Sequence, residues 1–251
     1  MSVARIYRAA TPFNGSELVD VDFEQSANTM YMAHLNHAPT KLVRNSHTDW
    51  TFSSVTFSPT IAAPTGAAVA NTTPNTDAPN AGAAYFPQPA SYAVTAVSDS
   101  SGQESRPSST VTATNCLTLL RNYNTITWSA VTGADRYRVY KANNSGDFGY
   151  IGTTTQLTFR DDNIGPDYSS GPPQSYNPFP GAGDYPSTVT FFEQRLLWGR
   201  TANNPNAVFA SRSGEYENMD TSRPLIASDS FSFKVVAGRV NVTPELVPVG
   251  W

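Results

Sequence analysis

Short runs in which apolar and polar residues alternate extend along most of the chain. Between residues 18 and 24, Asp20, Asp22 and Glu24 alternate with apolar residues. We therefore expect a strand there with the acids on one face and the apolar groups on the other. Three further strands are expected at 30–33, 41–44 and 50–57. The short strands, the polar turns and the lack of an amphipathic helix pattern predict an antiparallel meander.

The middle of the chain carries a second set of strand patterns. Residues 92–97 alternate clearly, residues 98–102 have the composition of a hairpin turn, and residues 109–113 form the expected return strand. Further strands are expected at 125–128, 137–140, 148–152 and 157–159. By contrast, the stretch from 64 to 89 is rich in Ala, Thr, Asn and Pro, which predicts a strand followed by a long loop.

Proline and glycine interrupt the pattern between residues 163 and 186, which predicts a linker or an extended arm. Strands are expected again at 188–192, 195–198, 207–211 and 230–235. The predicted fold class is all-β. The predicted domains are a β meander at 1–60, a β-sandwich at 61–165, the arm at 166–184 and a β region at 185–251 that packs with 1–60.

Composition supports this class and limits the function. Charged residues make up 14% of the 251 residues, against about 25% in an average soluble domain. The net charge of -4 gives no electrostatic footprint for wrapping nucleic acid. The chain has no 18-residue apolar run, and its first residues lack an apolar signal segment. We therefore expect neither a transmembrane helix nor Sec-type secretion.

Few cysteines and histidines are available for chemistry. The single cysteine, Cys116, excludes an intrachain disulfide and a cysteine-based zinc site, and we expect it in the core. His34 and His37 would hold a metal if a turn brought Asp49 or His47 close, but their spacing matches no zinc motif. We therefore expect solvated or hydrogen-bonded histidines, no bound metal and no cofactor.

Two acidic groups are further candidates for chemistry. Asp20, Asp22 and Glu24 share the expected strand face, and Asp161 and Asp162 stand together near the end of the middle module. Paired carboxylates act as acid and base in glycosidases, or they bind calcium. No calcium-loop spacing, nucleophile elbow or phosphate-binding loop is present. We therefore expect a solvated strand face, a polar turn and no enzyme activity.

A tryptophan and a tyrosine stand in the pattern Ile-x-Trp-x-x-Val-x-Gly-Ala-x-x-Tyr-x-Val-Tyr at 126–140. This pattern resembles strands B and C of a fibronectin type III or immunoglobulin-like sandwich, in which Trp128 and Tyr137 would be buried core anchors. Residues 92–108 are similar to strands F and G, with Tyr92 as a third anchor. Because the F–G half precedes the B–C half, we expect either a permuted sandwich or two incomplete modules, and a length of about 100 residues favours the first.

Three sequence blocks flank this module. They are Phe-x-Gln-Ser-Ala-x-x-Met-Tyr-Met-Ala-His with Pro-x-Lys-Leu-x-Arg at 23–44, Tyr-Pro-x-x-Val-x-Phe-Phe-Glu-Gln-Arg-Leu at 185–196 and Asn-Asn-Pro-x-x-Val-Phe-x-Ser-Arg-x-Gly-x-Tyr-Glu-Asn at 203–218. Taken in this order, they resemble the tail tube proteins (nozzle, or tail tubular protein B-like) of short-tailed bacteriophages. The resemblance implies a partial β-propeller-like region into which the sandwich is inserted.

The same resemblance implies a structural component of the virion's tail, made in the host cytoplasm. Such a protein would form a homo-oligomeric ring, expected as a hexamer, that helps to build the DNA-ejection conduit. It would dock the adaptor, fibres or other tail proteins, while DNA passes without specific binding and no part enters a membrane. Two alternatives stay open: a tail adaptor that attaches fibres outside the lumen, and a protein that binds or cleaves a host glycan.

Family members are generally longer and have several more propeller blades. Two or three blades cannot close a propeller, and open sheet edges are templates for aggregation unless they are covered. We therefore expect a fragment, a split gene product, or a shortened relative whose edges are paired by neighbouring subunits.

Three aromatic residues of the predicted arm, Tyr168, Tyr176 and Phe179, have no expected strand to belong to. They would either pack back on the sandwich or anchor in a neighbouring subunit. We select them as candidate interface residues.

Overall fold

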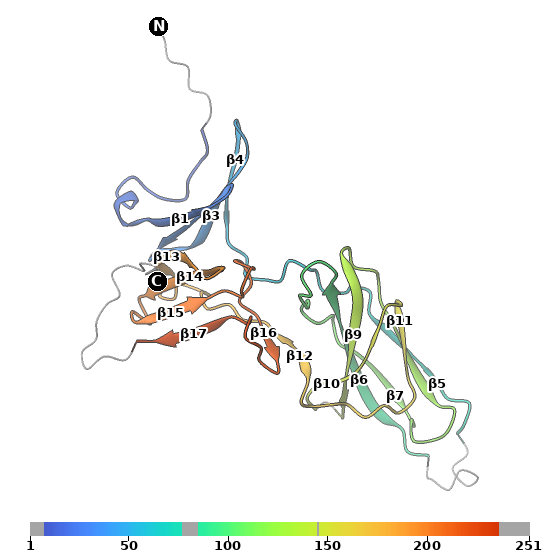
Figure 1. Ribbon diagram of the computed structural model, residues 1–251. Coiled ribbons are helices and arrows are strands. Elements are labelled where there is room, and N and C mark those ends of the chain that lie inside the picture. The colour runs from blue at the N-terminus through green and yellow to red at the C-terminus, as the bar shows by residue number, and fades with distance from the viewer. Residues whose placement is uncertain (1–7, 77–84, 145, 236–251) are drawn as a thin grey trace. The chain divides into compact units, whose positions relative to one another are not determined.

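Strands form nearly all of the regular structure in the computed structural model, which describes residues 8–76, 85–144 and 146–235 (Figure 1). Within these ranges the one helical element is a short 3-10 helix, η1, at Leu18–Asp20. No helix in the described ranges is long and apolar enough to cross a membrane. The protein is therefore all-β, which confirms the predicted fold class.

The chain divides into two compact units, which are described separately below. Unit 1 contains the described residues 8–58, 176–220 and 228–235, and unit 2 contains those within 59–175 and 221–227. The predicted arm is thus not a separate segment, because residues 166–175 belong to unit 2 and residues 176–184 belong to unit 1. Its two adjacent prolines lie inside a strand, β12.

Strand β12, Gly171–Gln174, pairs antiparallel with β16, Thr221–Arg223. The register pairs Gly171 with Arg223 and Gln174 with Thr221, so the two prolines fall between the paired positions. A proline has no N–H to give to a ladder, but here the ladder does not require one. A proline-rich sequence normally argues against a strand, and the sequence analysis therefore did not predict β12.

Unit 1 contains two four-stranded sheets whose neighbouring strands are all antiparallel. The first sheet has the order β1-β2-β3-β4, which confirms the predicted meander. Its strands are Asp22–Ser26 (β1), Thr29–His34 (β2), His37–Ser46 (β3) and Asp49–Ser54 (β4). The second sheet has the order β13-β14-β15-β17. Its strands are Pro186–Phe192 (β13), Arg195–Thr201 (β14), Ala207–Ala210 (β15) and Phe231–Lys234 (β17).

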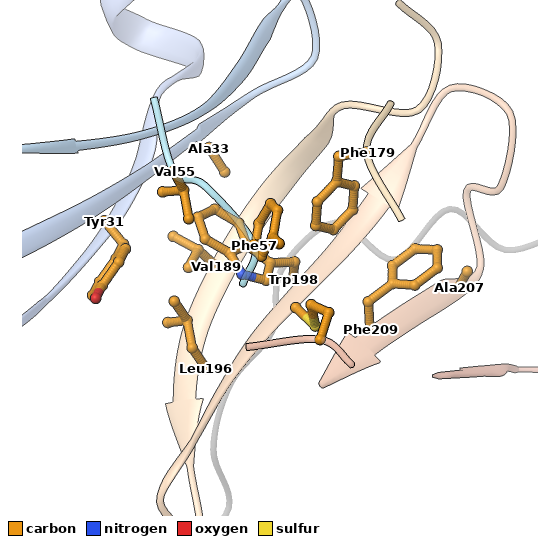
Figure 2. Close-up of a cluster of buried hydrophobic side chains, with 11 residues drawn as sticks. Tyr31, Ala33, Val55, Phe57, Phe179, Val189, Leu196, Trp198, Ala207 and Phe209 are labelled. Carbon is orange, nitrogen blue, oxygen red and sulfur yellow. The ribbon is translucent and has the colours of Figure 1, made fainter. Parts of the chain in front are cut away.

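Aromatic side chains around Trp198 form the core between these two sheets (Figure 2). The Trp198 side chain is fully buried, and its ring meets those of Tyr31, Phe57 and Phe179 at centroid distances of 6.3, 6.2 and 6.0 Å. Tyr31 comes from the first sheet and Trp198 from the second, although more than 160 residues separate them in sequence. Apolar burial therefore joins the two ends of the described chain into one unit.

Unit 2 contains a four-stranded sheet in the order β10-β9-β6-β7 and a three-stranded sheet in the order β11-β8-β5. The strands of the first sheet are Gln88–Ser98 (β6), Val111–Asn115 (β7), Ala134–Asn143 (β9) and Gly149–Thr154 (β10). Those of the second are Ala68–Thr72 (β5), Tyr123–Thr127 (β8) and Thr158–Asp161 (β11). Residues from both sheets share one buried cluster, so this unit is sandwich-like.

The three predicted core anchors all belong to that cluster. Tyr92 is fully buried, Trp128 is 5% exposed and Tyr137 is 4% exposed. The rings of Trp128 and Tyr137 meet at a centroid distance of 5.4 Å. The Tyr137 hydroxyl also accepts a hydrogen bond from the N–H of Val131, which satisfies the polar end of this buried side chain.

Ser105 and Ser108, on either side of Pro107, hydrogen-bond to β6 before the regular pairing of β7 begins. The backbone N–H groups of Ala96 and Val94 donate to the hydroxyls of Ser105 and Ser108, at 2.9 and 3.1 Å. In addition, the backbone N–H groups of both serines donate to β6 carbonyls. The regular pairing of β7 therefore begins only at Val111, slightly later than the strand that the sequence predicts from residue 109.

Candidate assembly interface

Strand β17 lies at one edge of the second sheet of unit 1 and is exposed along its whole length. Its partner is β15, and no other strand of the described residues pairs with its outer edge. An exposed edge strand presents unpaired N–H and C=O groups, which can pair with a strand of another chain. Strand β17 is therefore a candidate contact surface on backbone grounds alone.

Two phenylalanines make this edge apolar. Phe231 and Phe233 are each 48% exposed, and their rings lie nearly parallel with centroids 6.2 Å apart. The register pairs Val208 with Phe233 and Phe209 with Ser232. Residues that lie directly opposite each other point to the same face of a sheet, and Phe209 belongs to the core. The two phenylalanines therefore face away from the Trp198 core.

A cation lies over one of these rings. The guanidinium carbon of Arg195 lies 5.1 Å from the centroid of Phe231, and the same guanidinium donates to the carbonyls of Ser211 and Asp229 at 2.6 and 2.7 Å. Burial, followed by the charge of Arg212, lowers the pKa of Arg195 from its ordinary value. These contacts fix the position of the Arg195 guanidinium, which makes a cation–π contact with the Phe231 ring.

The sequence did not reveal this surface. Residues 230–235 were predicted to form a strand, and the pattern of two phenylalanines separated by one residue is typical of an ordinary core-facing strand. Only the register with β15 shows that these side chains face the opposite way. No local sequence pattern encodes that register, because it depends on strands more than 20 residues away.

The three aromatic residues predicted for the interface have different environments. Tyr168 is 53% exposed and belongs to unit 2, whereas Tyr176 is 42% exposed and belongs to unit 1. Burial comes first among the causes that raise the pKa of Tyr176, and a hydrogen bond with Ser232 of β17 opposes it. Tyr176 therefore adjoins the β17 edge, on the face that carries Ser232.

The prediction for Phe179 is wrong. This side chain is 4% exposed, and its ring meets those of Phe57 and Phe209 at centroid distances of 5.4 and 5.2 Å (Figure 2). Its backbone N–H donates to the side-chain oxygen of Asn177 at 3.0 Å, a local turn that the proline-rich pattern concealed. Phe179 is a core residue of unit 1 and is not accessible to another subunit.

The predicted strand face of solvated acids is only partly correct, because Asp20 is exposed whereas Asp22 and Glu24 are half-buried. Asp20 lies in η1 and not in a strand, and Asp22 and Glu24 occupy the half-buried face of β1. Phe23, between them, is 59% exposed. The Asp22 carboxylate accepts a hydrogen bond from the Val189 N–H of β13 at 2.9 Å. This acid therefore satisfies a backbone donor on a sheet edge, which explains why its face turns inward.

The second acidic group is a buried structural network. Asp161 is fully buried and Lys141 is 2% exposed, and their charged groups lie 2.8 Å apart. The same carboxylate accepts hydrogen bonds from the Tyr92 hydroxyl and from the N–H groups of Asn163 and Ile164. Burial, followed by the Asp161 hydrogen bond, raises the pKa of Tyr92. Neither charged group is exposed to a substrate.

Two histidines meet a glutamate at the end of the β2–β3 hairpin. His34 and His37 are paired directly across the strands, and their ring centroids lie 5.1 Å apart. The Oε2 atom of Glu17 lies 3.0 Å from Nε2 of His37. A backbone hydrogen bond from Asn14, followed by the His37 side chain, lowers the pKa of Glu17 from its ordinary value of 4.5. The structure brings Glu17 to the histidines in place of the Asp49 or His47 that we considered.

The remaining candidates have ordinary structural roles. His47 is exposed and lies 2.8 Å from a guanidinium nitrogen of Arg44. Cys116 is 1% exposed, as predicted for a core residue. Burial raises the pKa of its thiol, but hydrogen bonds from Thr118 and from backbone N–H groups outweigh burial, and the net shift is downward. A thiol this inaccessible is not a nucleophile for an external substrate.

Comparison with known proteins does not identify the chain. No protein-family model matches the sequence, and no curated protein is similar enough to count as a relative. The functional argument therefore rests on the residues and on the geometry described above.

Proposed function

We propose that this protein is a structural component of a bacteriophage tail that works as a ring of identical subunits, with a hexamer as the expected size. Unit 1 serves as the propeller-like platform that helps to form the DNA-ejection conduit. Unit 2 is a fibronectin type III-like module that docks fibres or neighbouring tail proteins. The observation that carries the proposal is the exposed β17 edge with its two phenylalanines.

The arrangement of the flanking blocks supports this platform. The blocks at 23–44, 185–196 and 203–218 resemble parts of one family, and all three contribute strands to unit 1. They share the buried cluster around Trp198, although unit 2 separates the first block from the others in sequence. Such an arrangement is expected of a platform that carries an inserted module.

The sheet order of unit 2 supports the module. In an immunoglobulin-like sandwich, strands C, F and G share one sheet, whereas strand B belongs to the other. Here β9, β6 and β7 are neighbours in one sheet, and β8 belongs to the other. These are the strands whose sequences resemble C, F, G and B. Because β6 and β7 precede β8 in the chain, the module would be a permuted form of that fold.

The open edge supports a second copy of this chain as the partner. Half-exposed rings of about 200 Å² each leave about 100 Å² per ring to bury, which corresponds to at most about 2.5 kcal/mol per ring. Aromatic anchors of this size are typical of interface hot spots. Repeated head-to-tail contacts between identical subunits close into a ring when the rotation between them is right.

The charge balance suits a conduit through which DNA passes without being held. A net charge of -4 provides no excess of basic residues to neutralise phosphates. The glycan-binding alternative has less support, because Trp128 and Trp198 are buried and cannot serve as sugar-stacking platforms. The adaptor alternative uses the same β17 contact and differs only in whether the ring lines the lumen.

The interface is tested by the double variant Phe231→Thr/Phe233→Thr, which keeps β-forming residues but removes both rings. We expect the dissociation constant between subunits to rise at least about 100-fold, measured by analytical ultracentrifugation. The control is Leu157→Thr in unit 2, where a leucine is 42% exposed, and it should leave assembly unchanged. If the double variant assembles like the wild type, β17 is not the contact.

A further inference from the structure

We propose that Glu17, His34 and His37 form a binding site for one zinc ion. This inference is independent of the proposed tail function. One ligand atom of each residue lies within 4.8 Å of the others, and the Glu17 and His37 atoms are already 3.0 Å apart. Zinc bonds to histidine nitrogen and carboxylate oxygen are about 2.0–2.2 Å long, so tetrahedral ligand atoms lie about 3.3 Å apart. Closing the cluster on an ion requires side-chain movements of about 1.5 Å at most.

The hairpin holds the two histidines in a chelating arrangement. His34 ends β2 and His37 begins β3, and the register places them directly opposite each other with only two residues between them. Directly opposite residues of an antiparallel pair have Cβ atoms about 5 Å apart and point to the same face. Two imidazoles on such a rigid frame need little reorganisation to share one ion.

Neighbouring groups fix all three ligands. The Phe13 ring meets the ring of His37 edge-on at 5.1 Å and that of His34 at 6.0 Å, and Phe13 itself is 7% exposed. The N–H of Asn14 donates to Oε2 of Glu17 at 2.9 Å. Groups of this kind, which touch the ligands and not the ion, orient the ligands of metal sites.

Two existing contacts must change when an ion binds. Nε2 of His37 donates to Oε2 of Glu17 at 3.0 Å, so coordination through these two atoms requires the Nε2 proton to move to Nδ1 or to be released to solvent. In addition, Nδ1 of His34 accepts a hydrogen bond from the N–H of Asn36 at 3.2 Å, so the proton of the neutral ring lies on Nε2. Coordination through Nε2 moves that proton to Nδ1, and coordination through Nδ1 displaces the same N–H. Either route replaces the long His34–Asn36 hydrogen bond with a zinc–nitrogen bond, in addition to the loss of the Glu17–His37 hydrogen bond.

An ion can reach this cluster from solvent. A cavity of about 260 Å³ is lined by His37, Pro12 and Phe52, and another of about 410 Å³ is lined by His34 and Asn36. Histidine nitrogens and a carboxylate form the donor set that zinc accepts, and zinc imposes no geometry through its d electrons. Three protein ligands leave a fourth position for water. The bound ion would link the segment before β1 to the β2–β3 hairpin.

The test uses the untagged full chain, treated with EDTA and titrated with ZnCl₂ against a chromophoric chelator. We expect one zinc per chain with a dissociation constant of about micromolar or tighter, and visible absorption bands when Co²⁺ replaces zinc. Glu17→Gln and His37→Asn should each weaken zinc binding at least about tenfold, with unchanged far-ultraviolet circular dichroism. The matched control is His47→Asn, because His47 is exposed and outside the cluster.

Two results would overturn the site. One is the absence of stoichiometric zinc binding by the wild-type chain. The other is binding that Glu17→Gln and His37→Asn leave unchanged or that His47→Asn weakens equally, since this would indicate adventitious surface binding. Because the readout is metal affinity, the result does not depend on whether the chain assembles into a ring.

Discussion

Replacing the buried acid of unit 2 tests the packing of the proposed docking module. Asp161 is fully buried, its carboxylate lies 2.8 Å from the Lys141 ammonium, and three further donors point at the same carboxylate. Asp161→Asn removes the charge with almost no change of volume, so no cavity complicates the result. The variant leaves the Lys141 ammonium, which is 2% exposed, with the carbonyl of Ile164 as a remaining acceptor at 3.0 Å.

The expected loss follows from these contacts. Removing one partner of a buried ion pair typically destabilises a protein by about 3–5 kcal/mol, because the other charge stays buried without compensation. Lys141→Met should cost less, about 1–3 kcal/mol, since the Asp161 carboxylate keeps the Tyr92 hydroxyl and two backbone N–H groups as donors. The asymmetry between the two variants is therefore part of the prediction.

Hydrogen exchange read by mass spectrometry measures this loss in unit 2 alone. Peptides from β6, β8 and β9 report its opening, and a loss of about 3–5 kcal/mol speeds their slowest exchange by about two to four orders of magnitude. The control is Asp135→Asn, because Asp135 forms an ion pair with Arg136 in which both side chains are more than 40% exposed. An exposed pair of this kind contributes at most about 1 kcal/mol.

Two outcomes would refute the reasoning about this network. The first is an exchange rate for Asp161→Asn that rises no more than that for Asp135→Asn, because this result would show that the Asp161–Lys141 pair is open to water. The second is an equal loss of unfolding free energy in Asp161→Asn and Lys141→Met. It would show that the hydrogen bonds to the Asp161 carboxylate do not compensate its charge when Lys141 is absent.

Three further predictions concern other parts of the molecule. Phe179→Ala should destabilise unit 1 by about 3–5 kcal/mol, measured by exchange in β14, because it opens a cavity beside the buried core; unchanged stability would instead return Phe179 to an interface role. Gly149→Ala should destabilise unit 2 by about 1–3 kcal/mol, because a Cβ at this position would lie 2.8 Å from the backbone carbonyl carbon of Asp167. Gly165→Ala is the control and should be neutral in the same exchange measurement, because the space around Gly165 is open. Burial raises the pKa of Glu215 above its ordinary value of 4.5, so wild-type stability should fall as the pH rises from 4.5 through that raised pKa. Glu215→Gln does not titrate, and its stability relative to the wild type should therefore rise over this window in urea unfolding; a constant difference would contradict the assignment.

Local sequence patterns were sufficient for most of the strands. Alternation predicted the meander of the first sheet and the pairs around Trp128 and Tyr92, because each depends on a side-chain period of two and on nearby turn residues. The core anchors of unit 2 were also predictable, since large aromatic residues on such strands are usually buried. In these places local pattern and long-range packing agree.

The failures occur where long-range contacts decide the outcome. Phe179 looked free because its own segment has no strand, yet the rings of Phe57 and Trp198, which are distant in sequence, enclose it. The sequence analysis likewise gave no orientation for Phe231 and Phe233, which their pairing with β15 turns outward. Both outcomes depend on which segments meet, and a single sequence does not contain that information locally.

The candidate zinc ligands show the same limit. His34 and His37 lie close together in sequence, but their spacing matches no zinc motif. Glu17 was not recognisable, because its approach depends on how the segment before β1 folds onto the hairpin. The sequence analysis therefore named this pair of histidines but predicted no bound metal, and it considered Asp49 and His47 instead of Glu17.

The most direct test of the proposed tail function is the mass of the purified full chain in solution, measured by light scattering and followed by electron microscopy of the assembly. The account predicts a closed ring, expected at six times the mass of one chain, with a central hole wide enough for duplex DNA. It also predicts that Phe231→Thr/Phe233→Thr converts this ring to smaller species. A wild-type chain that stays monomeric at all concentrations tested, alone and with the other tail proteins, would contradict the account.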